Sequence, residues 1–243
     1  MSKNAIPLGH ATNRLLRRIN TDALAMGNSE FEIIDVPMGK ILFDVGETIQ
    51  FVYFPHDMIL SILAVTSDGT TVEAAVIGSE GAAGLIEVLG DGVSQGRCVA
   101  QSAGMLSRMR VGRLRQEIES NTHFRKNMFC YIQFLFTQIL QMDVCSAIHT
   151  VEARCCRMIL TLRDGTGHDE IPLTHEWLAG MLGVHRPAIT SVTRHLQNAS
   201  LIQQRRGMMI VCDAEGLEKR ACECYSIIRE TYYRVLPTPR HSA

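Results

Sequence analysis

The side chains best suited to chemistry in this chain are four arginines of its C-terminal part, Arg186, Arg194, Arg205 and Arg206. A single acid, Glu176, lies just before them, although the whole chain has a formal net charge of −1. A guanidinium group is permanently charged and can donate two parallel hydrogen bonds to a phosphate or to a guanine edge. A basic segment in a nearly neutral chain therefore indicates a directed contact with an anion.

The residues around these arginines are typical of a helix-turn-helix. Thr174 is a suitable N-cap for a first helix, and Gly183 can adopt the left-handed conformation that turns the chain into a second helix, over about residues 185–198. Ala179 is small enough for the two helices to approach closely. An ordinary helical hairpin is the alternative. The predicted helix-turn-helix core comprises Leu178, Ala179, Leu182, Gly183, Val184, Ile189 and Val192.

The outer face of the second helix and a following hairpin are the predicted DNA contacts. The N-terminus of such a helix enters the major groove, where Arg186 can read a guanine; a phosphate contact is the alternative. Two short strands around Gly207 predict a wing with Arg205 and Arg206 at its tip, unless these are ordinary turn charges. The predicted contacts are Thr174, His185, Arg186, Pro187, Thr190, Ser191, Arg194, Arg205 and Arg206.

The segment from Phe31 to about Met109 contains short apolar runs separated by turn residues, which predicts an antiparallel β-sandwich or barrel. Such barrels also form metal-dependent enzymes, whose metal needs about three histidines and a carboxylate. His56 is the only histidine in this segment, and no nucleophile–base motif or phosphate-binding glycine loop is found. We therefore expect no enzyme activity. A small helix is predicted from Asn13 to Met26.

Residues 123–149 lack glycine and proline and carry apolar residues at alternating spacings of four and three, which predicts a long helix with a coiled-coil seam. Further apolar residues, Phe129, Phe134, Phe136 and Leu140, widen the apolar surface, so the helix needs cover on two sides. We expect a homodimer; a buried helix of a monomer is the alternative. The predicted dimer interface comprises Met128, Ile132, Leu135, Ile139 and Met142.

The order of β-roll, long helix and winged helix-turn-helix, with Val151-Glu-Ala-Arg154 opening the connecting helix, resembles the Crp/Fnr family of bacterial transcription regulators. The run from Leu173 to Val192 carries the same resemblance, which extends from about Leu15 to Leu236. It implies an α+β fold with a jelly-roll-like sensor domain at 1–122, a dimerisation helix at 123–149 and a winged helix-turn-helix at 150–243. It also implies a homodimer that binds a two-fold symmetric operator in double-stranded DNA and contacts RNA polymerase.

The chain departs from this family at the effector and operator contacts. Cyclic-AMP receptors carry an Arg-Ser or Arg-Thr pair where Ser94-Gln95 stands, so we expect a regulator that does not depend on cyclic nucleotides. A cyclic-nucleotide response through Arg97, an unknown small-molecule effector, and a sensor module without DNA binding remain alternatives. Pro187 and Ser191 replace usual recognition-helix residues, so the family's usual operator is not assumed. The residues of a candidate effector pocket are Glu80, Gly84, Ser94, Gln95 and Arg97.

The cysteines predict neither a metal nor another cofactor. Oxygen-sensing relatives hold an iron–sulfur cluster through N-terminal cysteines, whereas the first cysteine here is Cys98. Neither Cys155-Cys156 nor Cys222-x-Cys224 belongs to a four-ligand set with ordinary spacing. The sequence leaves open whether these four cysteines sense redox changes.

The beginning of the chain lacks the apolar core of a signal peptide, and no apolar run approaches the roughly 18 residues that cross a bilayer. We therefore expect a cytoplasmic protein that has no membrane partner and reduced thiols.

Overall fold

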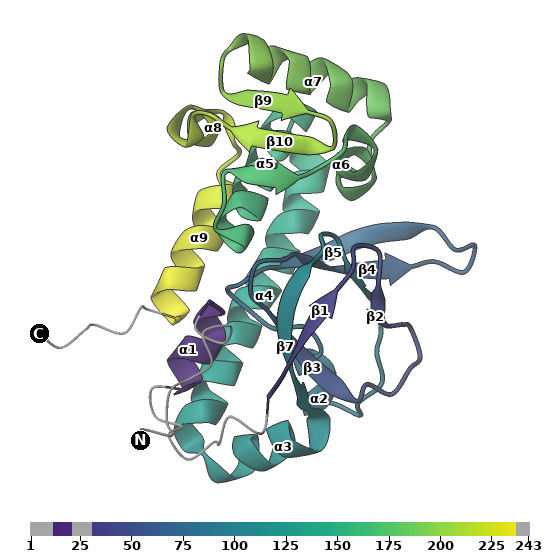
Figure 1. Cartoon of the computed structure of the whole chain (residues 1–243), viewed down its shortest axis with the longest axis vertical. Helices are drawn as coiled ribbons and strands as arrows, with labels where there is room; N and C mark the ends of the chain where they lie inside the picture. The colour runs from purple at the N-terminus through teal and green to yellow at the C-terminus, as the bar shows by residue number, and fades with distance from the viewer. Residues whose placement is uncertain (1–11, 21–30, 237–243) are drawn as a thin grey trace, which may run out of the picture.

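The computed structural model describes residues 12–20 and 31–236. Figure 1 shows a β-roll on one side of a long vertical helix and a winged unit at its upper end. A short helix, α1 (Arg14–Asn20), lies beside the lower half of the long helix, as predicted for this segment. The part of that prediction covering residues 21–26 lies outside the described residues. The observed fold is α+β, as the sequence indicates.

Two antiparallel sheets form the β-roll. One sheet has the strand order β1-β7-β3 and the other β2-β6-β4-β5. Among the short apolar runs of the predicted β-segment are those at residues 49–54, 59–65 and 71–77. They form β3, β4 and β5 with ends shifted by at most two residues, because their β-branched and aromatic residues suit a half-buried sheet. The strands are β1 (Glu32–Val36), β2 (Ile41–Phe43), β3 (Phe51–Pro55), β4 (Leu60–Val65), β5 (Thr71–Ile77), β6 (Arg97–Ala100) and β7 (Gly104–Arg110).

The interior of the β-roll is packed with apolar side chains, including those of Val52, Phe54, Cys98 and Met109. Two helices that the sequence analysis did not predict complete it, α2 (Leu85–Leu89) and α3 (Val111–Ser120). With five residues, α2 is too short to show a helical period, whereas Val111, Leu114 and Ile118 of α3 do follow helical spacing.

The long helix α4 (Thr122–Ile148) starts one residue earlier than predicted, with Asn121 as its N-cap. It packs against the β-roll on one side and contacts α9 on another. Met128, Leu135 and Met142 are buried within the chain, so their assignment to a dimer interface is wrong. Both faces of α4 are apolar, and the spacing alone could not tell which of them the chain itself covers.

A different stripe of α4 is exposed. Phe129, Phe136, Leu140, Val144 and Ile148 face solvent, with Phe136 60% and Ile148 68% exposed. Ile132 and Ile139, also predicted in the interface, are half-buried and pack against the core. An apolar stripe of this length on one helix marks a surface that a partner can cover.

By length and composition, α4 could also cross a membrane, contrary to the expectation that no segment could. In the described structure it is a core helix, since it packs between the β-roll and α9. The same test is passed by the core helices of soluble proteins.

The helix after α4 is longer than predicted. The spacing of apolar residues predicts a helix from Thr150 to Leu162, whereas α5 (Val151–Thr166) continues through Gly165 to a left-handed cap at Gly167. Gly165 lies against Gly78 of the β-roll, and a Cβ added to Gly78 would be 2.5 Å from the Gly165 Cα. The amide of Ser79 donates to the Gly165 carbonyl at 2.9 Å. The two glycines therefore allow direct backbone contact between the β-roll and α5.

The winged unit contains β8 (Glu170–Pro172), α6 (His175–Leu182), α7 (Arg186–Asn198), β9 (Ile202–Arg205), β10 (Met208–Val211) and α8 (Ala214–Arg220). The last helix, α9 (Cys224–Val235), runs back along α4, where Ile228 and Tyr232 join the core of the β-roll.

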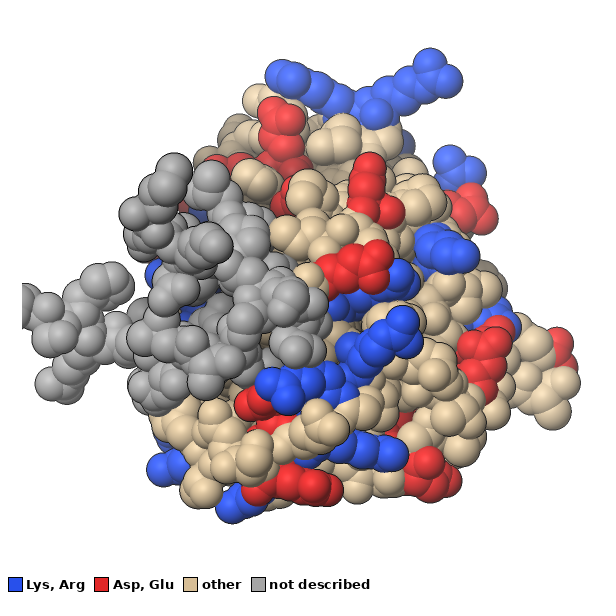
Figure 2. Space-filling view, turned by 60° about the horizontal axis from the view of Figure 1, so that its bottom comes forward, with Lys and Arg blue, Asp and Glu red and all other residues tan. Residues whose placement is uncertain are grey.

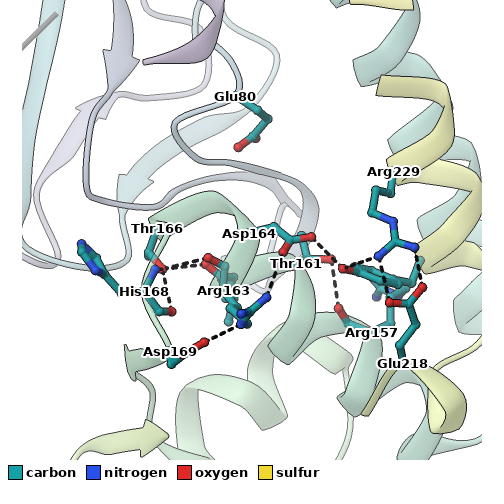
Figure 3. A network of polar contacts seen from close by, with 12 residues as sticks. Glu80, Arg157, Thr161, Arg163, Asp164, Thr166, His168, Asp169, Glu218 and Arg229 are labelled. Atoms are coloured by element: carbon teal, nitrogen blue, oxygen red, sulfur yellow. Dashed lines mark hydrogen bonds and ion pairs between the residues drawn. The ribbon is translucent and has the colours of Figure 1, made fainter. Parts of the chain in front are cut away.

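Polar contacts hold α5, α8 and α9 together (Figure 3). The Tyr225 hydroxyl donates to the Asp164 carboxylate at 2.8 Å, and Arg229 of α9 donates to Glu218 of α8 at 2.8 Å. Arg163 and Asp169 form a further ion pair at 2.6 Å at the end of α5.

Candidate nucleic-acid interface

The helix-turn-helix is built as its residues indicate. The Thr174 hydroxyl accepts a hydrogen bond from the Trp177 amide at 3.1 Å and caps α6, and Gly183 ends α6 at φ 62°. Pro187 lies in the first turn of α7, where its missing N–H has no intrahelical role. The predicted core residues are buried between α6 and α7, except that Val184 is half-buried and Gly183 is exposed at the turn.

The outward face of α7 is one open surface lined by Arg186, Pro187, Thr190, Ser191 and Arg194. Figure 1 shows α7 at the outer end of the molecule, on the side of the winged unit that points away from the β-roll. His185 is the exposed N-cap residue of α7, but its side chain makes no cap hydrogen bond. The structure thus brings the residues predicted on α7 together on a single accessible face.

The wing is present, and it has one more strand than predicted. β9 and β10 pair antiparallel, with Arg205 opposite Met208, and Gly207 takes φ 72° in the turn between them. Arg205 and Arg206 are exposed at this tip. The third strand, β8, pairs with β10 and was not predicted, because three residues are too few to show strand alternation.

His175 connects α6, α7 and the wing, and sequence reasoning did not identify it. Its ring contacts the hydroxyls of Thr190 and Thr193 at 3.2 Å each, and the Gln204 side chain of β9 hydrogen-bonds to the same ring. Thr190 and Gln204 come from separate elements, so no local spacing could have indicated this contact. His175 therefore fixes the position of α7 relative to the wing.

Electrostatics distinguish this end of the molecule. On the face shown in Figure 2, basic and acidic side chains are interspersed, so that no sign of charge dominates it. The exposed residues of α7 and the wing tip include four arginines, Arg186, Arg194, Arg205 and Arg206, and no acid. Such an arrangement suits the phosphates and base edges of a duplex.

The winged unit is also joined to the β-roll. The Trp177 indole of α6 donates to the Gln101 side chain. Ile59 and Val76, from the β-roll, are buried in the same cluster as the helix-turn-helix core. The position of α6 therefore depends on residues of the other domain.

The residues of the candidate effector pocket do not form one site. Glu80 is buried near the domain junction, where its carboxylate accepts from the Gly78 amide at 2.8 Å and lies 3.8 Å from Arg14. The Ser94 hydroxyl donates to the Gly96 carbonyl at 2.7 Å inside the β-roll, while Gln95 is exposed.

Gly84 and Arg97 serve structural purposes in this arrangement. Gly84 takes φ 90° at the start of α2, where a Cβ would lie 3.2 Å from the Phe51 carbonyl oxygen. Arg97 makes a two-pronged ion pair with Asp44, with Nε–Oδ1 and Nη2–Oδ2 distances of 3.0 and 2.8 Å. The Arg97 side chain holds the pKa of Asp44 below its ordinary value.

Comparison with known families identifies the winged unit. Residues 153–220 match the family model of the Crp-like helix-turn-helix domain, a range that runs from the first turn of α5 to the end of α8. No curated protein sequence matches the chain.

Solved structures extend this likeness to the fold of about three quarters of the chain. FixK2 from Bradyrhizobium japonicum is 10% identical with a TM-score of 0.68, over 79% of this chain and 98% of its own. A transcriptional regulator of the CRP family from Thermus thermophilus, TTHB099, is 15% identical with a TM-score of 0.63, over 77% and 96%. The c-di-GMP responsive regulator CLP of Xanthomonas campestris is 15% identical with a TM-score of 0.60, over 75% and 94%. At these identities the matches show a shared fold over the covered part of the chain.

Proposed function

We propose that this chain, a transcriptional regulator of the Crp/Fnr type with a Crp-like helix-turn-helix domain, binds a two-fold symmetric operator as a homodimer. In each half-site α7 enters the major groove, Arg186 reads a guanine edge, and the wing arginines Arg205 and Arg206 contact phosphates. A two-fold symmetric operator has two equivalent half-sites, and each would bind one chain of the homodimer.

The observation that carries this proposal is the outward face of α7. The outward face of α7 exposes Arg186, Ser191 and Arg194. The opposite face, which includes Ile189 and Leu196, is buried. A helix that is fixed on one side and presents polar and basic groups on the other fits the major groove, which is wide enough to admit an α-helix.

The exposed stripe of α4, formed by Phe129, Phe136, Leu140, Val144 and Ile148, supports the homodimer. Its residues follow one another at spacings of seven and four along one face of the helix. Two such helices can pack together about a two-fold axis and bury both stripes. The proposed interface is therefore this stripe, with Ile132 and Ile139 at its margin.

Regulation in this proposal does not use cyclic nucleotides. The Arg97 guanidinium already donates two hydrogen bonds to the Asp44 carboxylate, and the Ser94 hydroxyl donates to the Gly96 carbonyl. A buried cyclic phosphate would then lack a cationic partner, which costs several kcal/mol. Another small molecule or the abundance of the protein would set its activity. We further propose, from the family resemblance, a cytoplasmic location and a contact with RNA polymerase.

Selection of binding sites from a pool of random duplexes tests the proposal. We expect the purified chain to enrich an inverted repeat whose half-sites are about one helical turn apart. Addition of 1 mM cyclic AMP or cyclic GMP should change neither the affinity nor the melting temperature. Enrichment of a single, non-repeated site would contradict the dimeric geometry, and no enrichment would contradict sequence-specific binding.

A further inference from the structure

Four potential metal ligands meet where α4 ends and α9 begins. Cys145 lies in the last turn of α4, His149 caps this helix, and Cys222 and Cys224 flank the turn from α8 into α9. The three cysteines are buried. Their ligand atoms and one ring nitrogen of His149 all lie within 4.8 Å of one another. Cys222-x-Cys224 has no partners at ordinary metal-site spacing in the sequence, as expected, and the fold brings Cys145 and His149 to it from a distant segment.

Two of the six distances among these atoms lie close to the edges of a tetrahedron around one ion, and all six are within 4.8 Å. Cys145 Sγ and Cys222 Sγ are 3.4 Å apart, and Cys224 Sγ lies 3.6 Å from His149 Nδ1. With bonds of about 2.3 Å to sulfur and about 2.0 Å to nitrogen, tetrahedral edges are about 3.8 and about 3.6 Å long. Small shifts of the side chains would therefore place all four atoms around a single cation.

His149 Nε2, the ring nitrogen that faces away from the cysteines, lies beside a carboxylate, as it commonly does in metal-bound histidines. His149 Nε2 lies 3.1 Å from the Glu223 carboxylate, so Nδ1 is the nitrogen directed at Cys224. Such a carboxylate fixes the tautomer and the orientation of the ring and makes the ligand nitrogen more basic. If the cysteines were buried only as small apolar side chains, neither His149 nor Glu223 would be needed beside them.

A buried arginine completes the charge balance. Arg157 of α5 is 2% exposed, and its Nε donates to Cys145 Sγ at 3.3 Å. Three thiolates and a neutral imidazole around a divalent cation carry a net charge of −1, which the guanidinium neutralises. A buried charge is costly unless it is paired in this way.

We propose that Cys145, His149, Cys222 and Cys224 form a structural site for one zinc-class divalent cation. Three thiolates and one imidazole favour zinc over harder cations, and four protein ligands leave no open position for catalysis. The site joins the end of α4, the turn into α5 and the start of α9. The ion would fix the winged unit relative to the long helix, and this inference does not depend on the DNA-binding proposal.

Metal titration of the full chain tests the site. We expect the reduced, chelator-treated protein to bind one Zn²⁺ per chain and to gain melting temperature, because the four ligands are brought together only in the folded state, which therefore binds the ion more tightly than the unfolded chain. Bound Co²⁺ should give the absorption bands of a tetrahedral thiolate site. Cys224→Ser should lose these bands and the gain in melting temperature. The matched control is Cys212→Ser, because Cys212 is an exposed cysteine outside the cluster and should leave both unchanged.

A milder variant covers the case in which a cysteine variant fails to fold. Glu223→Gln keeps all four ligands, and we expect it to weaken Zn²⁺ binding about 10–100-fold. The proposal is overturned if the reduced wild-type chain binds no stoichiometric Zn²⁺ or Co²⁺, or if Cys212→Ser removes the Co²⁺ bands as Cys224→Ser does. A Cys145–Cys222 disulfide in the isolated protein, with no metal uptake after its reduction, would also overturn it.

Discussion

The winged unit and the junction at the end of α4 differ in the distance along the chain between interacting residues. In the winged unit the capping residue Thr174, the turn glycine Gly183 and the exposed Arg186 lie close together in the sequence. At the end of α4, Cys145 meets Cys222, and at the other end of α5, Gly165 meets Gly78 of the β-roll. The comparison teaches that DNA contact rests on a local motif, whereas the orientation of that motif rests on contacts between distant segments.

The difference between the local motif and the long-range contacts predicts which property each substitution should change. Changes on α4 or at the junction should alter assembly and stability and leave the base preference intact. Changes on the exposed face of α7 or on the wing should alter DNA binding and leave stability intact.

The largest expected effect follows from a charge in the exposed stripe of α4. Leu140→Lys should yield monomers, because an unpaired charge would be buried in the dimer interface. Loss of the second half-site should lower operator affinity by about 100-fold or more. Sizing and binding titrations measure both changes. Val72→Lys, at an exposed apolar residue of β5, is the control and should stay dimeric. A dimeric Leu140→Lys would show that another surface pairs the chains.

The contact between the domains should respond strongly to one methyl group. Gly78→Ala places a Cβ 2.5 Å from the Gly165 Cα, so the β-roll must shift away from α5 at a cost of about 1–3 kcal/mol. Gly180→Ala on α6 is the matched control, because its Cβ meets nothing within 4 Å. There the change should stabilise the helix by about 0.5–1 kcal/mol. Equal denaturation midpoints for the two variants would contradict the close contact.

A buried acid of the β-roll should make stability depend on pH. Burial raises the pKa of Glu73 from its ordinary 4.5 to about 8, although Ser61 donates a hydrogen bond to it. Between these values the folded chain holds a proton that the unfolded chain releases. The free energy of unfolding should therefore fall as pH rises from 4.5 to 8, by up to about 1.4 kcal/mol per pH unit.

Glu73→Gln should remove this part of the pH dependence, because the amide stays neutral throughout. Urea denaturation at pH 5 and pH 8 measures the effect, with Glu119→Gln at an exposed residue of α3 as the control. The same slope with pH in the Glu73 variant and the wild-type chain would contradict this assignment.

The smallest effect belongs to the wing. Arg205→Ala and Arg206→Ala should each weaken binding about equally for operator and random DNA and reduce the slope of log affinity against log salt by about 1. Their melting temperatures should not change, because both side chains are exposed. A loss confined to one operator position would instead assign the wing to base reading.

The sequence predicts the features that depend on local motifs better than those that depend on contacts between distant segments. Strands β3 to β5 and the helix-turn-helix were predicted because their signals lie within a few residues, as with Thr174, Gly183 and Pro187. The predicted dimer seam was wrong for Met128, Leu135 and Met142, because α4 is apolar on two faces.

Other features could not be predicted, because no local pattern carries them. His175 gains its role through Thr190 and Gln204, which belong to other elements. The ligands Cys145 and His149 have metal-site spacing between themselves, but their partners Cys222 and Cys224 follow only after the whole winged unit. Such contacts arise from the tertiary fold.

The most direct test of the central claim is the base preference of the Arg186→Ala variant on the selected operator. We predict that the variant loses about 1–3 kcal/mol of binding free energy and its preference at one position in each half-site, while its stability is unchanged. Lys40→Ala, at an exposed basic residue of the β-roll, should bind as the wild-type chain does. An equal loss on operator and random DNA would contradict base reading by Arg186, and no loss on either would contradict DNA binding through α7.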